Sequence, residues 1–230
     1  LDDIDKINTR VVRESTPIPD NIRYATFQNR DRDAINTALF STRCLQFSNN
    51  NQHTKDAILI FCDNIKLKNA QKVYVPMQNY NYFWSTCNSS DIDSSSGYDS
   101  GKGEPVLQLY QSCRVMLPNN INVSCGQANG TQATVVSIKL KPLEQISFVT
   151  LDNGCKIPAV LAGQVESIQL QHCNTRVHPN TFTISSIEYR RNVKILKPRV
   201  LQTKNYDREK VAMKFTQFPL LQNNATTGHK

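Results

Sequence analysis

Near the start of the chain, apolar positions recur at the three- and four-residue spacing of a helix. They are Ala34, Ile35, Ala38 and Leu39. This spacing predicts a helix over residues 29–40, with Asn29 or Asp31 able to cap its first turn. Residues 23–26 lead into it, so we expect a strand-to-helix step.

Two apolar runs follow the predicted helix. Residues 57–61 have the length and composition of a buried strand, and residues 72–77 resemble a second one that Pro76 ends. Strands alternating with a helix predict an α/β layer. The aromatic residues after the second run either stack on nucleic-acid bases or pack in a core, and they are Tyr80, Tyr82, Phe83 and Trp84.

Residues 85–104 are rich in Ser, Asp, Gly and Asn, and we expect a loop or linker there because little apolar surface offsets the entropy of ordering. The chain then becomes β-rich. Short strands are predicted at 106–110, 114–117, 133–140, 146–151 and 156–160. Asp152-Asn-Gly154 and Asn129-Gly130 mark tight reversals, and strands at this spacing suggest a small barrel.

Three more strands are predicted at 182–189, 193–196 and 213–221, with a charged, loop-like stretch between the last two. Small polar residues then follow the final strand. Such a sequence is typical of a chain that turns into a helix beside a ligand.

Lysine and arginine outnumber the acids. The 230 residues include 27 Lys and Arg against 19 Asp and Glu, which gives a net charge of +8 and a pI near 9.2. A positive field attracts polyanions, so nucleic acid is the first partner to consider. The cations form no long run, and an ordinary solvated surface explains the composition equally well. No stretch reaches the roughly 18 apolar residues of a membrane-spanning helix, and we expect no membrane partner.

The cysteines are odd in number and never adopt a close Cys-x-x-Cys spacing. They are Cys44, Cys62, Cys87, Cys113, Cys125, Cys155 and Cys173. Reduced, mostly buried thiols explain this spacing, whereas His172 beside Cys173 lacks the further ligands that zinc requires, so we expect no metal site. A secreted glycoprotein would need paired cysteines and a leader peptide besides the sequons at Asn88, Asn122, Asn129 and Asn224.

Three separated segments carry the motifs of the chain. Residues 25–36 read Ala-Thr-Phe-Gln-Asn-Arg-Asp-Arg-Asp-Ala-Ile-Asn. Residues 109–120 read Leu-Tyr-Gln-Ser-Cys-Arg-Val-Met-Leu-Pro-Asn-Asn, and Gly-Gln-Ala-Asn-Gly-Thr follows at 126–131. Residues 215–230 read Phe-Thr-Gln-Phe-Pro-Leu-Leu-Gln-Asn-Asn-Ala-Thr-Thr-Gly-His-Lys.

In this order the segments resemble the second motor domain of the Pif/RecD-type ATP-dependent DNA helicases of superfamily one, over most of the chain from about residue 20 onward. The first is similar to Thr-Asn-x-x-Val-x-x-Ile-Asn, with Gln28 in place of the Thr. The second is similar to the family signature that leads into an inserted barrel of Src-homology-three type. The third is similar to Gln-Phe-Pro-x-x-x-Ala-x-Thr-x-His-Lys.

The resemblance implies site residues at the two ends of the chain. Asn29 and Arg30 would contact the nucleotide or a phosphate, and Thr227, His229 and Lys230 would contact single-stranded DNA and couple its grip to the nucleotide cleft. A plain capped helix and a disordered C-terminal tail are the structural alternatives. We assign Asn129 and Gly130 first to the geometry of a turn, and a DNA-facing role is the alternative.

No Gly-x-x-x-x-Gly-Lys-Ser/Thr loop and no paired acidic motif occurs in the chain. The resemblance implies ATP and Mg²⁺ as cofactors of a full-length parent, and we expect this piece alone to bind neither and to have no catalytic residue. We expect the chain to be the C-terminal part of such a helicase, ending before the motor is complete.

The fold prediction is α/β: a partial RecA-like second motor domain with an inserted, β-rich barrel of Src-homology-three type. Residues 1–84 would form its first part, 85–104 a linker, 105–165 the barrel, and 166–230 the return to the RecA-like domain. By analogy the parent would be nuclear or otherwise intracellular, not secreted. It would unwind duplexes by moving on single-stranded DNA, with DNA junctions and its own upstream RecA-like domain as partners. A non-catalytic nucleic-acid-binding remnant of a mobile-element helicase is the alternative.

Overall fold

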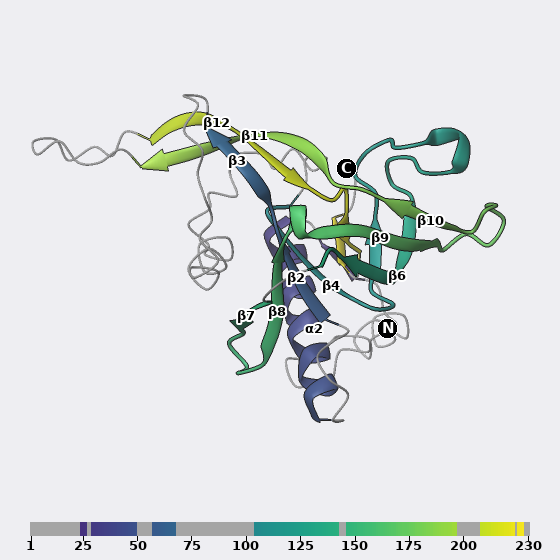
Figure 1. The fold of residues 1–230 in the computed structure, drawn as a ribbon, viewed down its shortest axis with the longest axis horizontal. Coiled ribbons are helices and arrows are strands. Elements are labelled where there is room, and N and C mark those ends of the chain that lie inside the picture. Colours follow the sequence, from purple (N-terminus) through teal and green to yellow (C-terminus); the bar gives the residue numbers. More distant parts are fainter. Residues whose placement is uncertain are drawn as a thin grey trace, which may run out of the picture.

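The computed structural model describes residues 24–26, 29–49, 57–67, 104–142, 146–196, 208–223 and 225–227. These residues form one α-helix and fourteen strands in four sheets, with 3-10 turns at Val123–Cys125 and Ala162–Gln164 (Figure 1). Strands pair both in parallel and antiparallel, which agrees with an α/β class in its coarse form. The predicted strand at 72–77, the aromatic group at 80–84 and the loop at 85–103 lie outside the described residues.

The predicted helix is confirmed and is longer than its apolar pattern. Helix α2 spans Asn29–Asn49 and follows the short strand β1, Tyr24–Thr26, along the chain. The predicted apolar face was wrong in part, because Ala34 and Ala38 are exposed. The buried stripe instead recurs every four residues and consists of Arg32, Asn36, Phe40 and Cys44. Because Arg32 and Asn36 are polar, a search for recurring apolar residues does not find this buried stripe.

Strand β2, Ala57–Phe61, is buried on both faces, as its continuous apolar run predicts. Its four-stranded sheet has the order β4-β2-β8-β7, with β4 at Val106–Tyr110, β8 at Lys156–Leu161 and β7 at Ser147–Thr150. Strand β8 runs parallel to β2, whereas β4 runs antiparallel to it. The predicted hairpin between β7 and β8 is confirmed, with Gly154 at a φ of 84° that suits glycine.

A second, five-stranded antiparallel sheet has the order β10-β9-β6-β5-β13. Its strands are β5 at Arg114–Met116, β6 at Gln132–Leu140, β9 at Val165–His172, β10 at Thr181–Ile184 and β13 at Leu221–Gln222. The strands of residues 105–165 therefore divide between two sheets: β4, β7 and β8 join β2, while β5 and β6 join β9. The barrel and the domain boundaries stay predictions.

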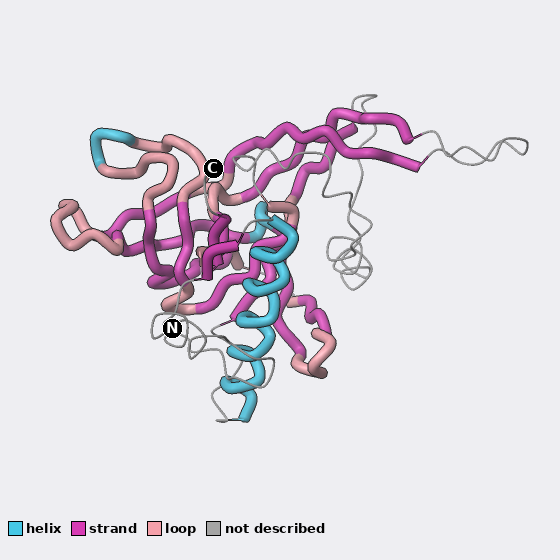
Figure 2. Tube along the Cα trace, turned by 180° about the vertical axis from the view of Figure 1, so that it is seen from behind, coloured by secondary structure: helices cyan, strands magenta, loops and turns pink. Residues whose placement is uncertain are grey.

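The two sheets and the helix form three layers. Ile58 and Ile60 of β2 point into a core shared with the five-stranded sheet, where they meet residues such as Ile168. Leu59 and Phe61, on the other face of β2, pack with Phe40 of α2. Figure 2 shows the helix lying alongside the strands. The alternation of a strand thus serves two cores at once, which explains why β2 has no polar position.

The third sheet extends from these layers as an arm (Figure 1). Its order is β11-β12-β3, with β11 at Ile187–Leu196, β12 at Arg208–Gln217 and β3 at Asp63–Leu67. Two separate strands were predicted for 182–189 and 193–196, and both boundaries were wrong. Strand β10 ends at Ile184, and β11 runs without a break from Ile187 to Leu196. The charged stretch before residue 213 was predicted as a loop, and this was wrong for 208–212, because cross-strand pairing with β11 makes it a strand.

Gln217, at the end of β12, is fully buried and holds three segments together. Its Nε2 donates to the carbonyl oxygens of Ile60 at 3.0 Å and Pro105 at 3.3 Å. Its Oε1 accepts a hydrogen bond from the backbone N–H of Phe218 at 3.0 Å. A buried carboxamide is stabilising only when its donor and acceptor are both used, as they are here.

Replacing Gln217 by Leu is expected to lower the free energy of unfolding by about 2 kcal/mol, because the Ile60 carbonyl loses a donor inside the core. Urea denaturation measures this change. Gln169→Leu is the matched control: Gln169 is exposed and accepts a surface hydrogen bond from Ser137, so its effect should stay within about 0.5 kcal/mol. Equal effects of the two changes would contradict the assigned role of Gln217.

All six cysteines among the described residues are free thiols: Cys44, Cys62, Cys113, Cys125, Cys155 and Cys173. Burial raises the pKa of the Cys44 thiol and of the Cys113 thiol to about 12. Cys173 is the exposed one of the six.

At neutral pH iodoacetamide is expected to modify Cys173 well before Cys44 and Cys113, because the thiolate is the reactive form and both buried thiols hold their protons. Peptide mapping by mass spectrometry follows the order of labelling. In urea the buried thiols should react as well. Cys113 labelled as fast as Cys173, or any of these residues found in a disulfide, would contradict the expectation.

Candidate nucleic-acid interface

A short parallel strand pair joins the two ends of the chain. Strand β14, Ala225–Thr227, pairs with β1 in the register Tyr24 to Ala225, Ala25 to Thr226 and Thr26 to Thr227. About two hundred residues separate these strands in sequence. The first and third motif segments, which were recognised independently, therefore lie side by side.

Parallel pairing places the carboxyl ends of both strands at one edge. Helix α2 begins at Asn29, directly beyond the end of β1, and α2 also contacts β14. In open α/β sheets, ligands bind beyond the carboxyl ends of parallel strands. The free N–H groups of a helix N-terminus favour anions at such a position. The backbone thus provides a corner that suits a phosphate group, and we call Thr26, Asn29, Arg30 and Thr227 together the strand-helix corner.

The predicted site residues divide into two groups. Asn29 and Arg30 lie in the first turn of α2, and Thr227 is the last residue of β14, so the backbone brings these three to the strand-helix corner. His229 and Lys230 lie outside the described residues. The contacts predicted for all five residues stay predictions.

A chain of buried polar groups holds the returning C-terminal segment against α2. Asn36 donates through Nδ2 to the carbonyl oxygen of Gln222 at 3.4 Å. Gln222 in turn donates through Nε2 to the carbonyl oxygen of Gln108 in β4. Gln108 completes the link with a 3.1 Å bond from Nε2 to Thr37 Oγ1 on α2. We call these four residues the polar seam, and it fixes β13 shortly before β14 begins.

Arg32 is a first-turn cation that already has partners. Its Nε donates to Asp33 Oδ1 at 2.7 Å, and its Nη2 lies 3.5 Å from Glu104 Oε1. The side chain is only 9% exposed. An ion pair in such a setting neutralises the charge that a phosphate would need. Arg32 therefore secures α2 to residue 104, and Arg30 is the neighbouring cation for which the nucleotide or phosphate contact is predicted.

Sequence reasoning assigned no role to the polar seam or to Asn223. Asn223 is 1% exposed, and neither atom of its side-chain amide has a hydrogen-bond partner. Its backbone N–H donates to the Arg114 carbonyl oxygen at 3.0 Å. The run of amides before β14 was a visible signal, because Gln and Asn in an otherwise apolar strand must find partners or remain costly.

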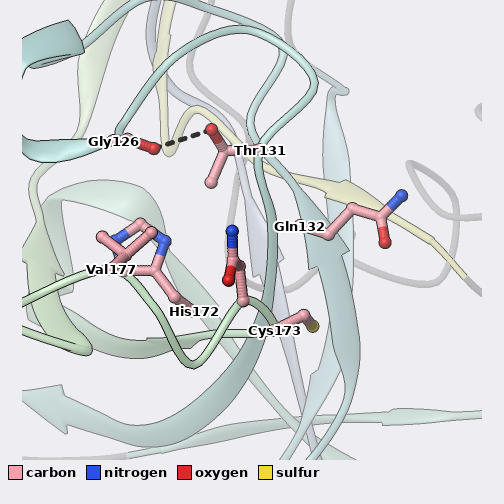
Figure 3. A pocket seen from close by; sticks show the side chains of 7 residues that line it. Gly126, Thr131, Gln132, His172, Cys173 and Val177 are labelled. Atoms are coloured by element: carbon pink, nitrogen blue, oxygen red, sulfur yellow. Dashed lines mark hydrogen bonds between the residues drawn. The ribbon is translucent and has the colours of Figure 1, made fainter.

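A pocket of about 470 Å³ lies beside the five-stranded sheet, where β6 begins at Gln132 and β9 ends at His172 (Figure 3). It is lined by Gly126, Thr131, Gln132, His172, Cys173, Asn174 and Val177. Thr131 Oγ1 donates to the Gly126 carbonyl oxygen at 2.8 Å and keeps this loop closed. At Gly126, φ is 74°, and a Cβ there would come within 3.1 Å of Val177 Cγ1, so a larger residue would be strained at this position.

His172 is the buried titratable residue of this pocket. Its ring packs on Phe182 with 4.4 Å between centroids, and its Nε2 has no hydrogen-bond partner. Burial lowers the pKa of the imidazole from its usual 6.5, because the protonated form loses its hydration. In the described part of the chain no three His, Cys, Asp or Glu residues are placed to hold a metal, and no helix is long and apolar enough to cross a membrane.

Neither the protein-family models nor the curated proteins contain a match to the chain. Among solved structures, it is similar to a Bacteroides Pif1 bound to single-stranded DNA, with 14% identity and a TM-score of 0.44. It is also similar to the Pif1 helicase from Candida albicans, with 12% identity and a TM-score of 0.46. The matches cover 98% and 99% of this chain, which spans 35% and 40% of those chains. TM-scores below 0.5 leave the assignment of fold and function to the geometry of this chain.

His172 is expected to make the folded state sensitive to acid. Its folded-state pKa lies below its unfolded value, so the unfolded state takes up the proton first. The free energy of unfolding should be constant for this group above about pH 6.5 and should fall as the pH drops from there through the lowered pKa. Urea denaturation from pH 7 downward measures the slope. His172→Phe should reduce it, while His178→Gln, an exposed control, should leave it in place.

Proposed function

We propose that this chain is part of the second RecA-like domain of a Pif/RecD-type DNA helicase, and that its strand-helix corner grips single-stranded DNA. The parent protein would bind ATP and Mg²⁺ mainly through an upstream RecA-like domain. It would translocate on single-stranded DNA and unwind duplexes. The chain itself would supply grip and would carry no catalytic residue.

The parallel pairing of β1 with β14 is the observation that carries this proposal. The family resemblance rests on segments at opposite ends of the chain, and an accidental likeness would not require them to meet. Their pairing at one carboxyl edge supports a common ligand site. The net charge of +8 also favours a polyanion as a partner of the chain.

The chemistry of the proposed grip follows from the residue types. A threonine hydroxyl at 227, an imidazole at 229 and an ammonium at 230 can each donate a hydrogen bond to a phosphate oxygen. Asn29 and Arg30, across the strand pair, would contact the nucleotide side of the same corner. Closure and opening of two RecA-like domains would then tighten and relax this grip as ATP is bound and hydrolysed.

The 230-residue chain is expected to bind oligo-dT weakly, with an affinity that falls steeply as salt rises. Arg30→Ala and Lys230→Ala should each weaken binding several-fold at about 50 mM salt, because each removes a phosphate contact. Fluorescence anisotropy measures the affinity. Lys156→Ala, an exposed cation in β8, is the matched control and should change little. Absent or salt-insensitive binding, or an equal loss in the control, would reject the proposal.

A non-catalytic nucleic-acid-binding remnant would bind DNA in the same way as a motor fragment. The two differ in the longer protein. A helicase parent would contain an upstream phosphate-binding loop and would hydrolyse ATP faster when single-stranded DNA is present. A parent chain without that loop and without DNA-stimulated ATPase would identify the remnant.

A further inference from the structure

Positive charge is concentrated in the arm formed by β11 and β12. Strands β11 and β12 contain six Lys and Arg against two acids, so these two strands carry four of the eight net positive charges of the chain. A local excess of this size creates a strong field over a small surface. The strand-helix corner does not include these residues.

Four side chains at the body end of the arm define its two faces. Tyr189 and Phe215 are paired in register, 4% and 1% exposed, and their rings stack with 5.6 Å between centroids. The Tyr189 hydroxyl also donates to Asn119 Oδ1 at 3.1 Å. Their neighbours Glu188 and Lys214 are exposed and form a 3.4 Å ion pair. One face therefore turns to the body and the other to solvent.

The register extends this division toward the tip. Successive residues of a strand belong to opposite faces, and directly paired residues share a face. The face of Lys214 therefore receives four pairs of positions: Arg190 with Lys214, Asn192 with Ala212, Lys194 with Lys210, and Leu196 with Arg208. Strand β3 adds Lys66 opposite Lys214. We call Arg190, Lys194, Arg208, Lys210, Lys214 and Lys66 the cationic face.

The other face of the arm has a different composition. Beyond Tyr189 and Phe215 it receives mostly apolar positions, with one cation and one acid. They are Arg191, Val193, Ile195, Glu209, Val211 and Met213. The acids assigned to the cationic face, Glu188 and Asp63, both stand at its body end, where Asp63 is paired with Thr216. Toward the tip, the described positions of the cationic face include Lys194, Lys210 and Arg208 but no acid.

We propose that the cationic face is a second DNA contact, which takes the phosphate backbone of duplex DNA. The inference rests on the proposed function and adds a partner surface to it. At a rise of about 3.3 Å per residue, the Lys194 row lies about 13 Å from the Arg190 row, so the charges are spread along the arm. A spread of cations suits a sequence-independent contact with a continuous line of phosphates.

The absence of aromatic residues from the cationic face favours a duplex over a single strand. Proteins that hold single strands combine cations with aromatic side chains on which the exposed bases stack. Among the described strands of the arm, Tyr189 and Phe215 are the aromatic residues, and both belong to the opposite, buried face. A duplex keeps its bases stacked inside and presents phosphates, which match a face that is rich in cations and has no aromatic residue among its described positions.

The test uses the 230-residue chain with Lys194→Gln and Lys210→Gln combined. The matched control combines Lys139→Gln and Lys156→Gln, which removes the same charge from exposed positions of β6 and β8. Affinities for a short duplex and for oligo-dT are measured between about 50 and 200 mM salt. Thermal melting of all proteins checks that the arm variant remains folded.

The slope of log affinity against log salt for the duplex should become shallower by about 1.8 in the arm variant, because two phosphate contacts are lost. The control slope should equal that of the wild type, and oligo-dT binding should be unchanged by the arm variant. The inference is overturned if the arm variant matches the control on duplex. Equal losses on duplex and oligo-dT would also overturn it, since the arm would then belong to the single-strand track.

Failure of the proposed function has a different signature. If the chain binds no oligo-dT but binds duplex through Lys194 and Lys210, the proposed single-strand site at the strand-helix corner is rejected and the proposed duplex contact of the cationic face is supported. If it binds neither DNA, both fall. The last measurement uses vesicles that contain phosphatidylserine. Binding to these vesicles that depends on the same two lysines, without binding to duplex DNA, would indicate a membrane surface as the partner and would overturn the inference.

Discussion

Buried carboxamides determine where the last third of the chain lies relative to the first. Gln217 bonds to the backbone of β2 and of Pro105, and Gln222 bonds to the backbone of β4 while its carbonyl receives Asn36 of α2. Each of these groups is removed from water, so each must keep its partner or incur a loss of about 1–3 kcal/mol. The C-terminal strands can therefore return in only one register, and the strand-helix corner depends on that register.

The apolar layers supply stability, and the buried carboxamides fix the register of the strands. Strand β2 gives one face to the core shared with the five-stranded sheet and the other to the core under α2. Burial of apolar surface is non-directional, so it favours compact layers without selecting one strand register over another. Hydrogen bonds from Gln217, Gln222 and Asn36 select the register, because each bond requires one particular partner. Stability and placement thus come from different residues of the same layers.

Charge is arranged on the outside of this frame in two places. The strand-helix corner combines the N-terminus of α2 with the end of β14, and the strands β11 and β12 of the arm carry half of the net positive charge of the chain. Arg32, which stands beside the corner in sequence, is neutralised by Asp33 and Glu104 and secures the helix. The charge of a side chain therefore does not by itself reveal its role, whereas the groups with which it pairs do.

Local patterns in the sequence were enough for most of the elements. The apolar run of β2, the helix that begins at Asn29 and the Asn153-Gly154 hairpin were all predicted, because each depends on side chains within a few residues of one another. Strand β9 was not predicted, although Val165, Ile168, Leu170 and His172 are buried within it. The start of β12 at Arg208 was missed as well, since its charged residues become a strand only by pairing with β11.

The sequence by itself determined most of the elements, the charge and the order of three motif segments. Only the tertiary structure decided that Thr26 and Thr227 are neighbours, that Arg32 is paired and buried, and that five of the six Lys and Arg positions of β11 and β12 share one face by register. The reason is physical: helices, turns and buried runs follow from interactions between residues close in sequence. Strand register and the partners of buried polar groups instead depend on residues that come together only when the layers pack.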